Sequence, residues 1–321
     1  MKLSIIIVNF NKKDCLRNLL DSINKNCKNI THEVIVVDNA SSDKSQQMIK
    51  EYFPGVKLLA QDKNIGTCAA YNLAFEQSRG KYICLMNDDI LIHENTMQVL
   101  MEFLDKNPAA GYAGPKNLDE NNNVLKSANK FRNPGYDIFF SYKHLFSGFY
   151  RRLRPEKTSK EFPEVPVRVD WMAFSCLMIR RSIPEKIGLF DKDIIIWWDD
   201  PYIQLKIYRA GWLGYYVPGA KITHLYKIYG LSKEKPHSGD KVSSVDLLWI
   251  YSKYAYFRKF YGIPGLSIVK CSDFFIFMIY LLANFLKLVF MRKNKTAKWE
   301  TNKWLGYFKC LFGIKARPTL I

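Results

Sequence analysis

The chain has 321 residues, of which 48% are hydrophobic and 15% aromatic, so it can form one large core or two modest ones and is not a disordered protein. The formal net charge of +18 is unevenly distributed, because residues 258–321 hold 12 Lys/Arg and 2 Asp/Glu, a net charge of +10. This segment is also rich in aromatic and aliphatic residues, which favours an anionic membrane surface over a nucleic-acid groove. No recognisable nucleic-acid-binding motif accompanies it.

The seven cysteines are scattered along the chain and form no CxxC pair. Their odd number and spacing argue against a disulfide framework or a zinc site and favour a reducing cytosol. The N-terminal MKLSIIIVNFN is apolar but short, lacks a small-residue cleavage site and runs into a polar helix pattern. We interpret it as a first strand rather than as a signal peptide.

Strands and helices are expected to alternate over the first ~115 residues. Apolar runs predict strands at residues 3–10, 33–37, 56–60, 81–86 and 109–114, with helical patterns between them. Near-continuous β-branched runs such as LSIIIVNF suit strands that are buried on both faces. The alternation is typical of an open, mostly parallel α/β sheet.

Polar residues follow the predicted strands, at Asn9, Asn11, Asp38, Asn39, Asn64 and Asn87 to Asp89. Parallel strands share one carboxyl edge, and ligands of such sheets bind there. Asp88 and Asp89 interrupt an apolar run, and adjacent carboxylates in a crevice suit a hard divalent cation. Taken alone, a polar turn explains them equally well. A dinucleotide-binding Rossmann domain is disfavoured, because VNFNKKD lacks the glycines of a phosphate loop.

The second half of the chain is less regular. Residues 130–165 predict a long loop or an irregular subdomain, and residues 167–181 are strand-like. Asp199 and Asp200 precede Pro201 at the expected start of a helix, and a later strand ends at His224.

Two helices are expected in the C-terminal region. Residues 245–262 predict an aromatic amphipathic helix, and residues 274–291 form an 18-residue apolar stretch at the lower length limit for a bilayer crossing. We expect the second to be an interfacial or re-entrant helix, with a transmembrane span and ordinary core packing as alternatives.

Seven segments then carry a family resemblance, in the order SIIIVNFN, VIVVDNASSD, KNIGTCAAYNLA, YICLMNDD, VDWMAFSCLMIRR, GLFDKDIIIWWDDPYIQLKIYRAGW and VPGAKITH. Over roughly residues 3–230 the chain resembles family 2 glycosyltransferases of the GT-A fold, especially bacterial rhamnosyl- and galactofuranosyl-type enzymes. The resemblance implies a GT-A (Rossmann-like) α/β catalytic domain at 1–230, with a nucleotide-binding half at 1–115 and an acceptor half at 116–230. Residues 231–321 would then form a helical, membrane-associating region.

The resemblance also implies a UDP- or dTDP-linked sugar donor and Mn²⁺ or Mg²⁺. It assigns the metal to Asp89 and His224, the nucleotide to Asp38 and Asp88, and the general base to Asp200 with Asp199 as its acidic neighbour. Further nucleotide-binding candidates at or near the strand ends are Asn9, Asn11, Asn64 and Gly66. A structural role remains open for His224, and a turn explains Asn64 and Gly66 equally well. Trp171 and Trp198 are candidates for stacking on sugar rings, with core packing as the alternative.

One departure from the family pattern concerns the base motif. The usual Glu-Asp-x-Asp is replaced by Asp199-Asp200-Pro201-Tyr202, which is closer to the galactofuranosyl type and leaves the donor sugar open. The chemistry nevertheless suits the residues. A metal ion neutralises the leaving diphosphate, and a carboxylate takes the proton of the acceptor hydroxyl in a single inverting displacement.

The sequence therefore predicts an inverting, metal-dependent glycosyltransferase on the cytoplasmic face of the membrane. It would move rhamnose, galactofuranose or a similar sugar to a glycan or lipid-linked glycan during cell-surface polysaccharide synthesis, with no nucleic-acid partner. Two alternatives are a nucleotidyltransferase of sugar metabolism, which would need a glycine-rich phosphate loop, and an inactive membrane scaffold of the same fold. The intact Asp89 and Asp200 argue against the scaffold.

Overall fold

The computed structural model describes residues 1–145, 163–173, 175–195, 197–225, 244–290 and 311. The chain divides into two compact units. The sheet unit comprises Met1–Phe131, Phe162–Lys192 and Asp199–Lys233, and the helical unit comprises Arg132–Glu161, Asp193–Trp198 and Glu234–Ile321. Of the residues that the sequence-based division at residue 230 places in the catalytic domain, the described residues 132–145, 193–195, 197 and 198 fall within the helical unit.

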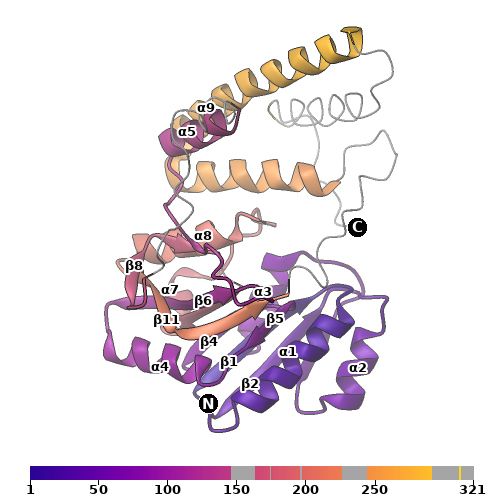
Figure 1. The fold of residues 1–321 in the computed structure, drawn as a ribbon, viewed down its shortest axis with the longest axis vertical. Coiled ribbons are helices and arrows are strands. Elements are labelled where there is room, and N and C mark those ends of the chain that lie inside the picture. The colour runs from indigo at the N-terminus through magenta and orange to yellow at the C-terminus, as the bar shows by residue number, and fades with distance from the viewer. Residues whose placement is uncertain (146–162, 174, 196, 226–243, 291–310, 312–321) are drawn as a thin grey trace. The chain divides into compact units, whose positions relative to one another are not determined.

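Nine described strands form the mixed sheet at the centre of the sheet unit (Figure 1). They are β1 (Leu3–Asn9), β2 (His32–Asp38), β3 (Lys57–Ala60), β4 (Tyr82–Asn87), β5 (Ile90–Ile92), β6 (Ala110–Leu118), β8 (Val167–Val169), β10 (Cys176–Arg180) and β11 (Leu213–His224). Their order is β3-β2-β1-β4-β10-β6-β11-β5, with β8 beside β11. The first four strands of this order are parallel, and β10 runs antiparallel to both of its neighbours. The predicted α/β fold is confirmed.

Helices cover both faces of this sheet. They are α1 (Lys13–Asn26), α2 (Ser45–Tyr52), α3 (Thr67–Glu76), α4 (Thr96–Lys106), α7 (Ser182–Ile187) and α8 (Asp199–Arg209). Ile5 and Ile7 share one core cluster with the buried side chains of α1, α2 and α4. Ile6 points to the opposite face, because successive strand residues alternate, and α3 packs on β1 and β2 there. The sheet is therefore enclosed, as its β-branched strands require.

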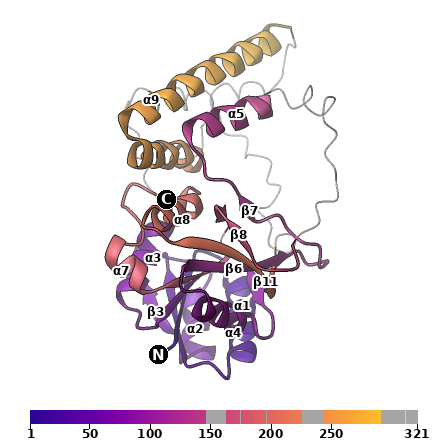
Figure 2. The same ribbon diagram turned by 90° about the vertical axis from the view of Figure 1, so that its left-hand side faces the viewer.

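The helical unit contains α5 (Pro134–Leu145) and α9 (Ser244–Phe290), which contact each other. The expectation of a loop over residues 130–165 is therefore wrong for Pro134–Leu145. The two predicted C-terminal helices are the two arms of α9, which bends at Gly262, where φ is 65°, just before Pro264 (Figure 2). A buried Lys253 ammonium joins the elements of this unit. It lies 2.8 Å from Asp137 of α5 and 2.8 Å from Asp273 of α9.

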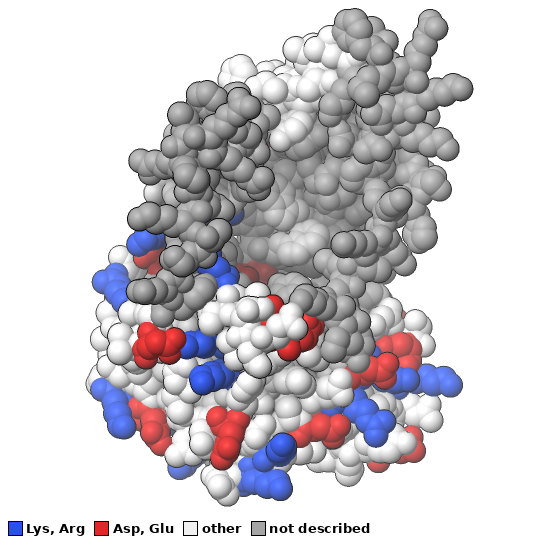
Figure 3. All heavy atoms as spheres, in the orientation of Figure 1, with Lys and Arg blue, Asp and Glu red and all other residues white. Residues whose placement is uncertain are grey.

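The second arm of α9 exposes an apolar face, which we call the outer stripe. Its members, which follow one another at spacings of one, three and seven residues, are Ile268, Phe275, Met278, Ile279, Leu282, Phe285 and Leu286. The segment Leu248–Ala283 is long and apolar enough to cross a membrane, and 28% of its most apolar window is buried. In Figure 3 the described surface of the sheet unit carries both signs of charge, whereas the described surface at the top of the view is uncharged.

Candidate active site

The candidate site lies where the strand order reverses. From β1 the chain adds β2 and β3 on one side, and β4 then pairs with β1 on the other side. Ligands of open α/β sheets bind at such a switch point, outside the carboxyl ends of the strands. The register pairs Asn9 with Asp38 and Val8 with Asn87, so the polar residues that follow β1, β2 and β4 lie at one edge of the sheet. The predicted polar edge is therefore present.

Four side chains from three segments meet at this edge. The Lys12 ammonium, in the loop between β1 and α1, lies 2.9 Å from Asp88 Oδ1 and 2.8 Å from Asp89 Oδ2. On the other side of the pair, His224 Nε2 lies 3.0 Å from Asp89 Oδ1. The antiparallel register of β11 and β5 pairs His224 with Ile90, which puts the imidazole beside Asp89. The sheet topology thus brings together residues that are 135 positions apart in the sequence.

The two aspartates differ in their electrostatics. Burial raises the pKa of Asp88 from the usual 3.8 to about 6, although Lys12 opposes this shift. Burial also acts on Asp89, but the hydrogen bond to His224 and the charge of Lys12 outweigh it and hold the pKa of that carboxyl well below its usual range. Asp89 is therefore the more firmly ionised of the two, which suits a metal ligand.

A divalent ion fits part of this arrangement. Asp89 Oδ1 and His224 Nε2 are 3.0 Å apart, the separation of adjacent ligands about 2.1 Å from one octahedral ion. Within the part of the chain that the structure describes, no three His, Cys, Asp or Glu side chains form a complete metal site. The remaining ligands would have to be water and substrate phosphate, a common arrangement for Mg²⁺.

Asp38 is the centre of a buried hydrogen-bond network. It is fully buried, and its carboxylate accepts bonds from Asn9 Nδ2 at 2.7 Å, from the Ser41 backbone N–H at 3.0 Å and from Gln46 Nε2 at 2.8 Å. Asp38 therefore faces protein donors rather than an open pocket. Its hydrogen bonds order the loop that follows β2. A direct contact between Asp38 and a nucleotide base would require this loop to rearrange.

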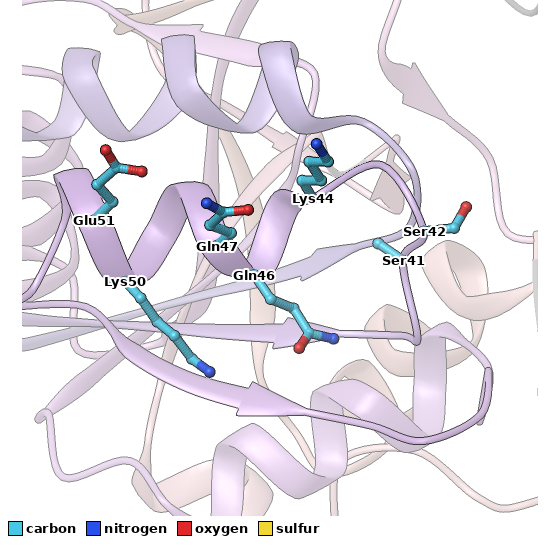
Figure 4. Close-up of a pocket in the computed structure, with 7 residues that line it drawn as sticks. All are labelled: Ser41, Ser42, Lys44, Gln46, Gln47, Lys50 and Glu51. Atoms are coloured by element: carbon cyan, nitrogen blue, oxygen red, sulfur yellow. The ribbon is translucent and has the colours of Figure 1, made fainter.

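A surface hollow adjoins this network (Figure 4). Its lining residues come from the loop after β2 and from α2, and they are Ser41, Ser42, Lys44, Gln46, Gln47, Lys50 and Glu51. In the figure, Gln46 and Lys50 point to one side of α2, whereas Gln47 and Glu51 point to the other. The hollow is polar, so its side chains can offer hydrogen bonds to a nucleoside edge.

The remaining nucleotide candidates stabilise loops. Asn11 Oδ1 accepts a bond from the Ser42 backbone N–H at 2.8 Å, and Asn11 itself has a positive φ of 54°. Asn64 Oδ1 accepts the Gly66 N–H at 2.9 Å, and Gly66, with φ of 86°, precedes α3. These contacts are those expected of turn residues. A nucleotide contact by Asn11, Asn64 or Gly66 stays a prediction.

Asp199 and Asp200 begin α8. Their charges act on Tyr71 of α3, whose hydroxyl donates to the Met86 carbonyl of β4 at 3.0 Å. Burial raises the pKa of the Tyr71 phenol well above its usual range, and the nearby charges of Asp199, Asp88 and Asp200 raise it further. Asp199 and Asp200 therefore act on the same buried ring as Asp88, the neighbour of the metal candidate Asp89.

The two tryptophan candidates are in different units. Trp171 lies in β9 (Trp171–Met172), which pairs with β7 (Ala128–Asn129), and its indole N–H donates to the Lys130 carbonyl at 2.7 Å. It remains partly exposed. Trp198 belongs to the helical unit, is 3% exposed and packs against the rings of Trp249, Tyr256 and Phe257. Its burial favours the packing alternative over contact with a sugar.

Three residues important to this geometry were not among the sequence-based candidates. Lys12 neutralises the Asp88–Asp89 pair, and Gln46 binds Asp38. Gln204, fully buried on α8, donates to the Met172 and Asp200 carbonyls and accepts the Met172 N–H. It thereby ties the strand of Trp171 to the helix of Asp200. The only signal in the sequence was their polarity at positions flanking the recognised motifs.

Comparison with known proteins shows the family of the chain. The family model described as glycosyl transferase family 2 matches residues 4–188, more than half of the chain. The chain belongs to glycosyl transferase family 2. The match extends from β1 to the end of α7 and so includes the Asp38 network, Asp88 and Asp89.

Individual relatives are distant. A Mycobacterium tuberculosis N-acetylglucosaminyl-diphospho-decaprenol L-rhamnosyltransferase is 26% identical over 208 residues, which cover 60% of this chain and 66%, just under two thirds, of the relative. A Staphylococcus aureus poly(ribitol-phosphate) β-N-acetylglucosaminyltransferase, TarP, is 26% identical over 39% of this chain and 43% of its own length.

Two solved structures share the fold. A crystal structure of GalNAc-T7 with UDP, GalNAc and Mn²⁺ has a TM-score of 0.54 and 19% identity, covering 82% of this chain and 51% of that chain. S. aureus TarS 1-349 has a TM-score of 0.51 and 14% identity, covering 99% of this chain and 93% of that chain. At these identities the likeness shows the GT-A-like fold alone.

Proposed function

We propose that this family 2 member is an inverting, metal-dependent glycosyltransferase that uses a nucleotide-sugar donor. The observation that carries the proposal is the Asp88–Asp89 pair at the switch point of the sheet, where Asp89 lies 3.0 Å from His224; the charges of Asp199 and Asp200 act with that of Asp88 on the buried Tyr71. This arrangement offers both groups that sugar transfer needs, a site for positive charge at the leaving group and a carboxylate base for the acceptor.

Each residue has a proposed role. Asp89 and His224 hold Mn²⁺ or Mg²⁺, which supplies positive charge to the leaving diphosphate. Asp88 lies next to them, toward the ribose. Asp200 takes the proton of the acceptor hydroxyl, and Asp199 is its acidic neighbour. The Asp38 network, with Asn9, orders the loop that faces the nucleoside.

The substrates are proposed from the relatives. The mycobacterial relative is named for rhamnosyl transfer to a lipid-linked diphosphate sugar, which supports a lipid-linked glycan acceptor and a donor carrying rhamnose, galactofuranose or a similar sugar. The short Asp199-Asp200-Pro201-Tyr202 motif leaves the donor sugar undecided between these types. Cell-surface polysaccharide synthesis is the process that uses such substrates.

We place the enzyme on the cytoplasmic face of an anionic membrane. The support is the outer stripe of α9, whose Phe275, Leu282 and Phe285 are 59–60% exposed, together with the net charge of +10 over residues 258–321. Apolar side chains with an excess of Lys and Arg bind anionic lipid surfaces. A membrane location brings the site to a lipid-linked acceptor.

The reaction is tested by incubating the purified full chain with UDP-, dTDP- and GDP-sugars, Mn²⁺ and a lipid-linked glycan primer. We expect one nucleotide series to support transfer, with inversion at the anomeric carbon seen by NMR. Asp21→Asn, an exposed change on α1, is the control for general damage. Retention of configuration, or no turnover with any donor, would contradict the proposed reaction.

The membrane location is tested by vesicle flotation. Phe275→Glu with Leu282→Glu places two charges on the outer stripe, and we expect the full chain to stop floating with anionic vesicles. The control is Tyr52→Glu, which changes an aromatic residue that is 52% exposed on the sheet unit. Equal flotation of the stripe variant and the control contradicts the docking role.

A further inference from the structure

Lys12 occupies a position that the proposed reaction does not explain. Its ammonium lies within 3 Å of one oxygen of Asp88 and one oxygen of Asp89. The other Asp89 oxygen faces His224. Both oxygens of the proposed metal ligand are therefore engaged by protein partners, and the ammonium supplies the positive charge that a metal ion would otherwise bring.

This contact has two consequences for a divalent ion. The pair of adjacent carboxylates, 8% and 19% exposed at the side chain, is already stabilised by a cation. An ion held by Asp89 and His224 would also lie close to the Lys12 ammonium, and like charges at short range repel strongly in a poorly solvated site. Lys12 therefore opposes the binding of a metal ion on its own.

The lysine is also able to leave. Its side chain is 38% exposed, it extends from a loop rather than from within a helix, and its four-carbon stem is flexible. A donor diphosphate at the carboxyl edge of β1 and β4 would offer this ammonium a new anionic partner. When Lys12 turns to the diphosphate, the Asp89 oxygen becomes available to the metal.

We propose that Lys12 couples donor and metal binding: it holds Asp88 and Asp89 before the donor binds, disfavours the metal alone, and moves to the diphosphate when the donor binds. The inference rests on the proposed function and adds an order of ligand binding to it. In that order, the metal binds tightly only together with the nucleoside diphosphate. Such coupling is reciprocal, so each ligand strengthens the other by the same factor.

The test measures binding rather than turnover, with the full-length protein. Free Mn²⁺ is followed by EPR with and without saturating UDP or dTDP, and each nucleotide is titrated calorimetrically without metal. Lys12→Met should bind Mn²⁺ alone about tenfold more tightly, bind the nucleotide alone more weakly, and show a coupling factor reduced by about tenfold. A merely structural role would weaken both ligands.

The controls separate charge at this position from net charge. Lys13→Met removes the same charge one residue away and should bind like the wild type. Lys12→Arg keeps the cation and should restore most of the coupling. Association of Mn²⁺ with the nucleotide in solution contributes equally to all variants and cancels in the comparison.

Two outcomes overturn the inference in distinguishable ways. If the wild type binds Mn²⁺ and nucleotide but Lys12→Met has an unchanged or weaker affinity for Mn²⁺ alone, Lys12 does not compete with the metal and only this inference fails. If the wild type binds no Mn²⁺ even with UDP or dTDP present, the proposed metal-dependent function fails and this inference fails with it.

Discussion

Asp88 should reduce the stability of the sheet unit at neutral pH. Its pKa is raised from 3.8 to about 6 in the folded protein, chiefly by burial. The folded state therefore binds this proton more tightly than the unfolded chain, and the stabilisation present below pH ~4 is lost as the pH rises through ~6. A shift of about two units corresponds to ~3 kcal/mol. Asp88→Asn cannot ionise and should regain much of that free energy.

The magnitude is a net value, because the attraction of Lys12 already opposes the shift. In the variant, Lys12 keeps its ion pair with Asp89. The pKa of Asp89 is held below its usual range by His224 and Lys12 despite burial. We therefore expect Asp88→Asn to be more stable than the wild type by about 2–3 kcal/mol near pH 7.5, with the difference vanishing near pH 4.

The assay is native-state hydrogen exchange of the β4 amides, Tyr82–Asn87, which reports the opening of the sheet unit without requiring the whole chain to unfold in one step. Wild type and variant are compared at the same pH, with Asp21→Asn as the exposed control. An Asp88→Asn variant that is equally or less stable near pH 7.5, or a gain that does not depend on pH, would refute the reasoning.

Two further predictions concern buried polar groups. Lys253→Met should destabilise the helical unit by about 3–5 kcal/mol in urea unfolding, because it leaves Asp137 and Asp273 buried without their shared cation. Adding Asp137→Asn and Asp273→Asn to this variant should recover most of the lost stability. No recovery would contradict the ion-pair explanation. Gln204→Leu should cost about 2–3 kcal/mol, because it leaves both backbone polar groups of Met172 without their partner. Gln204→Glu keeps an acceptor for the Met172 N–H but sets a buried carboxylate against the Met172 and Asp200 carbonyls, so it should cost at least as much near neutral pH and less at low pH, where it is protonated. A loss in Gln204→Glu that does not depend on pH would argue against this account.

The carboxyl edge of the sheet could be predicted because strand ends are visible in the sequence. Apolar β-branched runs stop at Asn9, Asp38 and Asn87, and a parallel sheet must bring such ends together. His224 could be proposed only through the family resemblance, since its proximity to Asp89 depends on the register of β11 against β5. Register across 135 residues is not encoded in any local pattern.

Lys12 could not be predicted for a related reason. Two lysines follow one another in VNFNKKD, and the positive φ of Asn11 sets how the chain leaves β1. Loop geometry, rather than residue type, decides which lysine reaches the aspartates.

The helix α5 was missed because its stability comes from tertiary contacts. Asp137 pairs with Lys253 of α9 and with Arg132, and the mixed aromatic and basic composition of this stretch has no clear helical period. Trp198 was equally ambiguous in the sequence. A tryptophan beside two aspartates can face a ligand or a core, and only the surrounding rings show that it packs in the helical unit.

The central claim is that the carboxylates at the switch between β1 and β4 serve sugar transfer, with Asp200 as the base. It is tested most directly by measuring transfer and nucleotide affinity side by side in the wild type and in Asp200→Asn, with whichever donor supports turnover. The account predicts that kcat falls by at least about 10²-fold while the nucleotide Kd stays within about twofold. Near-normal turnover by Asp200→Asn would contradict it.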